Sequence, residues 1–148
     1  MAYATIADAS ANFQATKYTG SSSSVNVTNE GNSNLQPDLI WVKRLNGAND
    51  HNIFDTNRGL NNRQWTNLAG SSNTGTSVAA LTNGFSTGTY WGDVNANGST
   101  FISWQWKGNG GTNSTNNDGS ITSTVQANTA AGFSILRWAR TGSNGPVA

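Results

Sequence analysis

The chain has 148 residues and a formal net charge of +1, and only 10% of its residues are charged. This balance excludes the concentrated positive charge that nucleic-acid binding needs, and the absence of cysteine excludes disulfides and thiolate metal sites. Asparagine, serine, threonine and glycine make up half of the residues, while six tryptophans, five phenylalanines and three tyrosines are enough to form a core.

Short strand-forming segments alternate with turn-forming segments along the whole chain. Threonine and aromatic residues favour strands, whereas asparagine, glycine and serine favour turns. In chain order, strands are predicted over 13–19, 25–28, 38–45, 51–55, 63–68, 77–81, 84–89, 99–107, 121–125 and 133–138. No segment has the 3.6-residue period of an amphipathic helix. This pattern predicts an all-β fold, an antiparallel β-sandwich or barrel.

Two of these strands carry a more detailed prediction. The near-continuous apolar run over 38–45 predicts a central, largely buried strand, and the Asn46-Gly47 turn predicts that 51–55 is its hairpin partner. In 99–107, side chains alternate between two faces. One face carries Ile102, Trp104 and Trp106, and the other carries Phe101, Ser103 and Gln105. The tryptophan face is predicted to be the one inside the core.

The beginning of the chain recurs near its end. Phe13 aligns with Phe133, and Tyr18 with Trp138, both at an offset of 120 residues. This offset is the length of a domain and exceeds the period of about 20–50 residues found in solenoids. The sequence therefore predicts four parts, which are an N-terminal arm (1–12), a β-sandwich domain (13–110), a polar linker (111–131) and the start of a second repeat unit or a C-terminal strand (132–148).

No arrangement of residues indicates catalysis. His51 is the only histidine, and no G-x-S-x-G motif is present. The seven acidic residues lie mostly in turns, and their spacing singles out no pair of the kind that a glycosidase uses. Asp55 and Arg58 are predicted to form a local ion pair at a strand end. The chain is predicted to be no enzyme, and no catalytic residue or cofactor is assigned.

One segment resembles half of a calcium-binding loop. Asp93, Asn95 and Asn97 match the pattern D-x-[DN]-x-[DN]-G, in which alternate oxygens surround the cation. Position twelve of that loop is Trp104, so the bidentate glutamate is missing, and no flanking helices are expected. Because Asn97-Gly98 is also a favourable hairpin turn, a plain turn is the preferred interpretation and calcium is the alternative.

Tyr90, Trp91 and Asp93 are the candidate ligand-binding residues. Two adjacent aromatic side chains beside a polar loop are suited to stack on a sugar ring, and loops at the end of a sandwich often carry binding functions. If any aromatic side chain is an exposed platform, the sequence favours Tyr90 and Trp91.

The order of several motifs resembles a known family. These motifs are F-x-x-x-x-Y-T-G from Phe13, Q-P-D-L-I-W-V-K from Gln36, H-N-I-F-D-T-N-R-G from His51, N-G-F from Asn83, N-x-N-G from Asn95, W-x-W-K from Trp104 and D-G-S-I-T-S-T-V-x-A-N-T-A-A-G-F-S-I from Asp118. Together they resemble the tandem domain of structural proteins in marine bacteriophages, including cyanophages. That domain is often described as tail-fibre-like and is similar to concanavalin A-like jelly rolls.

The resemblance implies a component of the virion, assembled in the cytoplasm of the host bacterium. The expected function is the N-terminal, particle-attached domain of a tail fibre or adhesin, and two alternatives stay open: a capsid decoration protein and a lectin-like module that binds host surface glycan. The expected partners are other tail or capsid proteins and further copies of the chain, with a trimer favoured and with no nucleic acid or membrane. The arm, residues 1–12, is expected to be flexible until it docks.

Overall fold

The computed structural model describes residues 7–69, 73–74, 78–89 and 92–139. Within these ranges nearly all regular structure is β, and neither helix is long and apolar enough to cross a membrane. The elements are η1 Ala9–Ala11, β1 Phe13–Thr19, β2 Val25–Val27, β3 Leu39–Arg44, β4 Asn52–Asp55, β5 Asn62–Trp65, β6 Asn73–Thr74, β7 Ala79–Leu81, β8 Gly84–Thr87, α1 Gly92–Asn95, β9 Thr100–Trp106, β10 Ser114–Asn116, β11 Ser123–Asn128 and β12 Phe133–Trp138.

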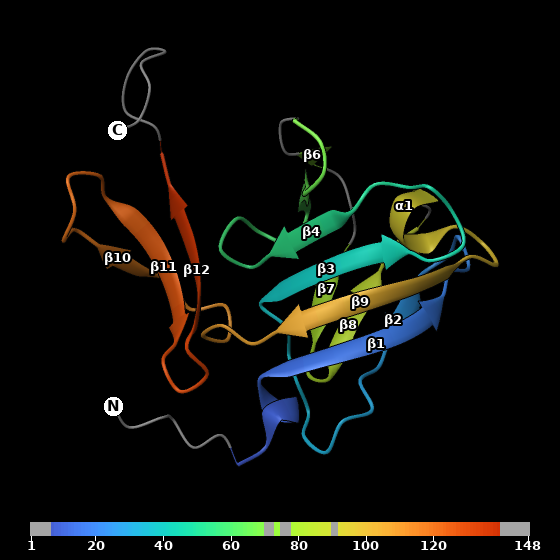
Figure 1. Cartoon of the computed structure of the whole chain (residues 1–148), viewed down its shortest axis with the longest axis horizontal. Coiled ribbons are helices and arrows are strands. Elements are labelled where there is room, and N and C mark those ends of the chain that lie inside the picture. The colour runs from blue at the N-terminus through green and yellow to red at the C-terminus, as the bar shows by residue number, and fades with distance from the viewer. Residues whose placement is uncertain (1–6, 70–72, 75–77, 90–91, 140–148) are drawn as a thin grey trace.

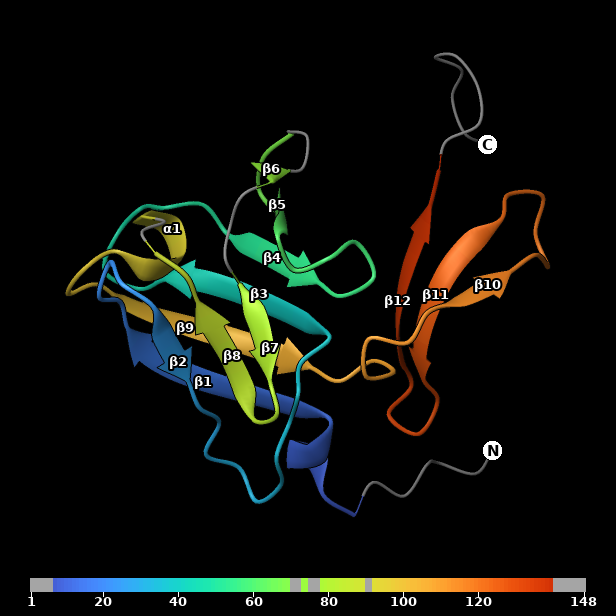
Figure 2. The same cartoon turned by 180° about the vertical axis from the view of Figure 1, so that it is seen from behind.

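Two antiparallel sheets face each other and enclose one core (Figure 1). The larger sheet has six strands in the order β1-β9-β3-β4-β5-β6. The smaller sheet has the order β2-β8-β7 and lies in front of the larger sheet in Figure 2. Both sheets and α1 contribute to the core, whose buried side chains are Val27, Ile40, Val42, Phe54, Val78, Phe85, Val94 and Phe101. The predicted all-β antiparallel sandwich is confirmed.

The position predicted for the strongest strand is also confirmed. β3 lies between β9 and β4 in the larger sheet. It forms the expected antiparallel hairpin with β4, in which Ile40 is opposite Phe54. Both side chains are completely buried. Only Ile40 and Val42 of this strand are buried, and the side chains that alternate with them are partly exposed on the outer face, so β3 is central as predicted but is fully buried on one face only.

The alternating strand β9 presents the opposite face to the core from the one predicted. Phe101, Ser103 and Gln105 are completely buried, whereas Trp104 is only partly buried on the other side. Burial of Gln105 is tolerated because its side-chain amide pairs reciprocally with that of Asn29, at 2.7 and 3.0 Å. The buried side-chain amides of Gln105 and Asn29 thus satisfy each other.

The tryptophans predicted for the core form an aromatic row on the outer face of the larger sheet. The rings of Trp41 and Trp104 meet edge to face, with centroids 5.6 Å apart. Trp106 lies beside Phe13, with centroids 4.9 Å apart. These side chains stabilise β1, β9 and β3 from outside the sandwich, where water still reaches part of each ring.

A third sheet lies at one end of the sandwich (Figure 1). Its strands have the order β10-β11-β12, and all pair antiparallel. Residues 111–131 were expected to be a polar linker with one strand over 121–125, but they contain two strands, β10 and β11. The correction has a physical reason: β12 supplies a partner for β11, and threonine-rich polar segments form strands readily when such a partner is present.

The end of the expected flexible arm is ordered in this structure. Residues 9–11 form the 3-10 helix η1, and Asp8 is its N-cap. The Asp8 carboxylate accepts hydrogen bonds from the Ser10 hydroxyl, the Ser10 backbone N–H and the Ser33 hydroxyl at 2.6, 2.9 and 2.6 Å. The Ser10 hydroxyl and then the Ser33 hydroxyl lower the pKa of Asp8 most. Residues 1–6 of the arm lie outside the described ranges.

The cap formed by Asp8 predicts a loss of stability in acid. Because its pKa is lower in the folded chain than in the unfolded chain, its contribution is present at neutral pH and lost as the pH falls below about 4. We expect Asp8→Asn to lower the free energy of unfolding at pH 7, and we expect the difference between the two chains to shrink at pH 3. Urea unfolding at both pH values measures this difference in the free energy of unfolding, and an equal difference at both would contradict the prediction.

Candidate functional site

The candidate ligand-binding residues are only partly described by the structure. Tyr90 and Trp91 lie outside the described residues, so the predicted aromatic platform stays a prediction. Asp93 lies in α1, where its two carboxylate oxygens accept hydrogen bonds from Asn49 Nδ2 and Arg63 Nη1, both at 2.8 Å. Asp93 therefore connects α1 to β5 and to the loop before β4, and about a quarter of its side chain remains exposed.

Arg63 is the buried partner of Asp93. Its guanidinium also donates to Asn52 Oδ1 at 3.1 Å and lies over the ring of Trp65, 4.0 Å from the ring centroid. Burial lowers the pKa of Arg63, and the hydrogen bond to Asp93 opposes this shift. The ion pair is thus needed to compensate a charge that the fold has taken out of water, which gives Asp93 a structural role.

The residues of the calcium hypothesis do not present a shared set of oxygens. The Asn95 side chain is completely buried; its Oδ1 accepts the Ser21 N–H at 2.9 Å, and its Nδ2 donates to Ser23 O and Gly88 O at 2.6 and 2.8 Å. Within the described ranges no three acidic, histidine or cysteine side chains are placed to hold a metal ion. Asn95 instead fastens the turn after β1.

His51 and Asp55 each take part in hydrogen bonds that hold local structure. His51 has a structural hydrogen bond, because its Nδ1 accepts from Trp41 Nε1 at 3.2 Å. Asp55 and Arg58 form the predicted ion pair, with Arg58 Nε 2.5 Å from Asp55 Oδ2. The Arg58 backbone N–H also donates to Asp55 Oδ1 at 2.8 Å, so the pair fixes the turn after β4.

A dense group of polar contacts lies where the sandwich meets the third sheet, and no sequence pattern predicted it. Asp38, just before β3, is completely buried. Its carboxylate accepts the backbone N–H groups of Gly108, Gly110 and Gly111 at 2.7, 2.9 and 2.6 Å. Gly110 and Gly111 have positive φ angles of 59° and 76°, a conformation that glycine adopts without strain. Asp38 therefore holds the turn that leads from β9 to the third sheet.

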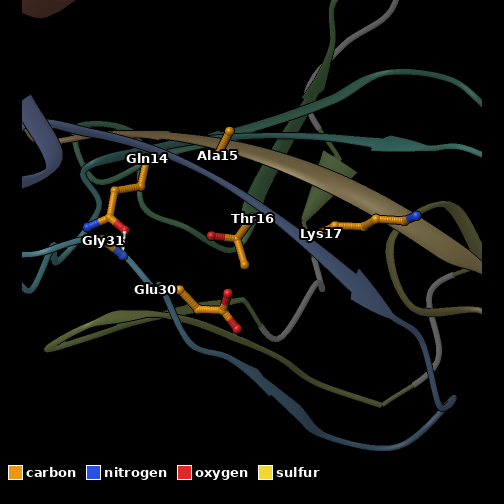
Figure 3. A pocket seen from close by; sticks show the side chains of 6 residues that line it. All are labelled: Gln14, Ala15, Thr16, Lys17, Glu30 and Gly31. Atoms are coloured by element: carbon orange, nitrogen blue, oxygen red, sulfur yellow. Dashed lines mark hydrogen bonds between the residues drawn. The ribbon is translucent and has the colours of Figure 1, made fainter.

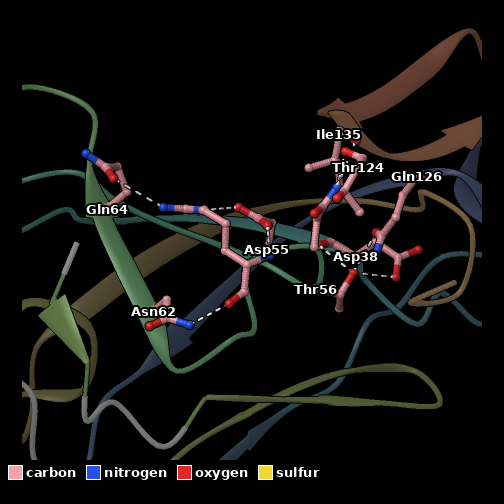
Figure 4. A network of polar contacts seen from close by, with 10 residues as sticks. Asp38, Asp55, Thr56, Asn62, Gln64, Thr124, Gln126 and Ile135 are labelled. Carbon is pink, nitrogen blue, oxygen red and sulfur yellow. Dashed lines mark hydrogen bonds and ion pairs between the residues drawn. The ribbon is translucent and has the colours of Figure 1, made fainter. Parts of the chain in front are cut away.

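The turn after β4 contacts the third sheet directly (Figure 4). The Thr56 hydroxyl lies 2.7 Å from Gln126 Oε1 and 3.0 Å from Asp38 Oδ1, so its single proton is shared between these two acceptors. Asn57 Nδ2 donates to Thr124 O and Ile135 O at 2.9 and 3.2 Å. We call Asp38, Thr56, Asn57 and Gln126 the junction cluster.

Aromatic and amide contacts complete this junction. Trp106 lies between Phe13 and Phe133, and its ring is stacked on that of Phe133 at a centroid distance of 6.1 Å. Asn128 Nδ2 donates to Asn12 Oδ1 at 2.8 Å and to Lys107 O at 3.2 Å. Contacts on several sides hold the third sheet in one orientation.

Comparisons with known proteins give one finding. The model of a family described as "Domain of unknown function (DUF7483)" matches residues 8–148, which include both the sandwich and the third sheet. A search of curated proteins found no match, and a search of solved structures found none either.

Proposed function

We propose that this chain, which belongs to the DUF7483 family of domains of unknown function, is a structural protein of a bacteriophage particle. The proposed place is the N-terminal, particle-attached domain of a tail fibre or adhesin. The observation that carries the proposal is the junction cluster, because it fixes the third sheet at the end of the sandwich. A device of this kind suits a building block that transmits orientation from one unit to the next.

Two features of the chain support this proposal. The ordered motifs over nearly the whole sequence resemble the tandem domain of marine phage structural proteins. The strands of the sandwich have neighbours distant in sequence, such as β1 with β9 and β2 with β8. We propose on this basis the finer assignment to a concanavalin A-like jelly roll. The buried polar groups at the junction hold elements together, and we propose no chemistry for them.

The proposal includes partners and a location. The partners are other tail or capsid proteins, the location is the virion, and the chain forms a homotrimer through a closed interface. Light scattering after gel filtration tests the trimer, since the mass expected is three times the 15.5 kDa of the chain. A monomer at every concentration would contradict it.

Labelling of purified particles tests the function itself. Particles of a phage whose genome encodes this chain are labelled with antibodies and observed by electron microscopy, and we expect label at the tail. Label over the whole capsid would favour the decoration alternative and overturn the tail assignment. Absence of the chain from purified particles, checked by mass spectrometry, would overturn both.

The lectin-like alternative has its own measurement. It predicts saturable binding to host surface glycan that is lost on Trp91→Ala. Because Trp91 lies outside the described residues, the matched control is Trp41→Ala, which removes a partly exposed tryptophan of the outer aromatic row. Equal binding by both variants, or no binding by the unchanged chain, would remove this alternative.

A further inference from the structure

Among the described residues, strand β12 is paired along one edge only. Ser114 Oγ donates to Val125 O, so the Val125 carbonyl points toward β10, and Asn57 Nδ2 reaches both Thr124 O and Ile135 O between β11 and β12. Backbone groups alternate along an antiparallel strand. Those of Phe133, Ile135 and Arg137 therefore face β11. Those of Ser134, Leu136 and Trp138 face outward, where no hydrogen bond from the described part of the chain reaches them.

In the described part of the chain, strand β1 is also paired along one edge only. Here the even-numbered residues, not the odd-numbered ones, have their backbone groups on the paired edge. Asn12 O accepts the Lys107 N–H, and the Gly20 N–H donates to Ser99 O, both at 2.9 Å. The backbone groups of even-numbered residues thus face β9. Those of Phe13, Ala15 and Lys17 face outward and receive no hydrogen bond from described residues.

A hollow lies along this open edge of β1. It has a volume of about 370 Å³ and is lined by Gln14, Ala15, Thr16, Lys17, Glu30 and Gly31. Figure 3 shows it between β1 and the segment that carries Glu30 and Gly31. β9 covers the other edge of β1, so the hollow is on the side where a further strand could be added.

The sequence repeat relates these two open edges. Phe13 corresponds to Phe133 and Tyr18 to Trp138, so β1 and β12 are equivalent strands. The backbone groups of odd-numbered residues face outward in β1, whereas in β12 the backbone groups of odd-numbered residues face β11. The open edge of β1 is therefore equivalent to the β11-paired edge of β12. In the same way, the open edge of β12 is equivalent to the β9-paired edge of β1.

The side chains of β12 also support its equivalence to β1. Leu136 and Trp138 are 52% and 58% exposed, among the most exposed large apolar side chains of the described residues. Their equivalents are Thr16 and Tyr18. Tyr18 packs against the core, with its ring stacked on Phe101 at 5.2 Å and edge-on to Phe85 at 5.8 Å. The exposed face of β12 is thus the face that β1 buries.

We propose that β12 is the shared strand between two copies of this module. It ends the third sheet of one copy, and it takes the place of β1 in a second copy. There β9 of the second copy pairs with the outward groups of Ser134, Leu136 and Trp138, and the second core covers Leu136 and Trp138. The sheets then continue from copy to copy, with the junction cluster setting the angle between them. This inference does not depend on a location in the virion.

The test is a chain of residues 1–139 followed directly by residues 20–148. The first copy is whole through β12, and the second copy has no β1 of its own. We expect the amides of Leu136 and Trp138 in the first copy to exchange with deuterium about 100-fold more slowly than in the single chain. Paired amides exchange only through local unfolding, whereas free edge amides need no opening. The corresponding amides at the end of the second copy stay fast and serve as the internal control.

A proline variant separates the two edges of β12. Leu136→Pro removes an outward N–H, so it is tolerated in the single chain, as proline is on edge strands. In the linked chain the same variant is expected to abolish the slow exchange of Trp138. Exchange of Leu136 and Trp138 at the single-chain rate in the linked chain overturns the proposal.

A reciprocal chain is the control for the case in which the second copy of the first linked chain fails to fold for another reason. It joins residues 1–132 directly to residues 13–148, so that the second β1 replaces β12. We expect the amides of Ala15 and Lys17 to be slow in the second copy, where β11 covers them, and fast in the first. Equal rates in the two copies overturn the proposal independently of the first chain.

Discussion

Replacement of Asp38 by alanine is expected to lower the free energy of unfolding by about 2–3 kcal/mol, because it leaves one buried and two partly buried backbone N–H groups without their acceptor. These are the N–H groups of Gly108, Gly110 and Gly111. Water that enters the space will recover part of the loss. The third sheet is expected to lose its fixed orientation as well, since the turn that Asp38 holds leads directly into it.

Two measurements check the effect of Asp38→Ala. Urea unfolding gives the free energy, and amide exchange at Gln126 and Ile135 reports whether the third sheet remains docked. The control is Asp118→Ala, which removes an exposed carboxylate and is expected to change the stability by less than about 0.5 kcal/mol. Equal losses in the two variants would show that the buried carboxylate does not hold the junction.

Replacement of Phe101 by alanine is expected to lower the free energy of unfolding by about 3–5 kcal/mol, the range for a large aromatic residue removed from a core. Phe101 is completely buried and is stacked on Tyr18. The cavity would lie between the two sheets, where neighbours on several elements lose contacts. The loss of stability is therefore expected to affect the whole sandwich.

The matched control for Phe101→Ala is Trp104→Ala on the other face of the same strand. Trp104 is larger, but it is only partly buried against Trp41. By buried area we expect about half the loss that Phe101→Ala causes. Urea unfolding of the two variants decides which face of β9 is the core. A larger loss for Trp104→Ala would contradict the arrangement described above.

The fold class could be predicted from the sequence because strands and turns have local signals. Alternation and β-branched residues mark the strands, and pairs such as Asn46-Gly47 mark the turns. The hairpin of β3 and β4 follows from such signals alone, as does the Asp55–Arg58 pair, whose members are three residues apart. These contacts are short in sequence, so neighbouring residues determine them.

The orientation of β9 could not be predicted in the same way. Alternation shows which side chains share a face, but it does not show which face is inside when both faces mix polar and apolar residues. The more apolar tryptophan face was the natural choice. It was wrong because Asn29, 76 residues away in sequence, supplies the reciprocal hydrogen bonds that make burial of Gln105 favourable.

The candidate sites show the same difference between local signals and contacts that form only on folding. A loop motif suggested calcium at Asp93, Asn95 and Asn97, but motif spacing does not reveal that Ser21 and Ser23 already engage the Asn95 side chain and that Arg63 engages Asp93. The junction cluster had no local signal at all. An aspartate after a proline and a glycine-rich turn are each ordinary, and only folding brings Asp38 to Gly108.

By itself the sequence determined that this chain forms short strands and turns, that one strand is central, and that the first strand recurs as β12. Each of these properties depends on residues close together in the chain or on direct similarity between segments. Only the tertiary structure decided which face of β9 is buried, how the third sheet is held, and which edges of β1 and β12 are open. Those outcomes depend on hydrogen bonds and packing between distant segments, whose partners become neighbours only after the chain has folded.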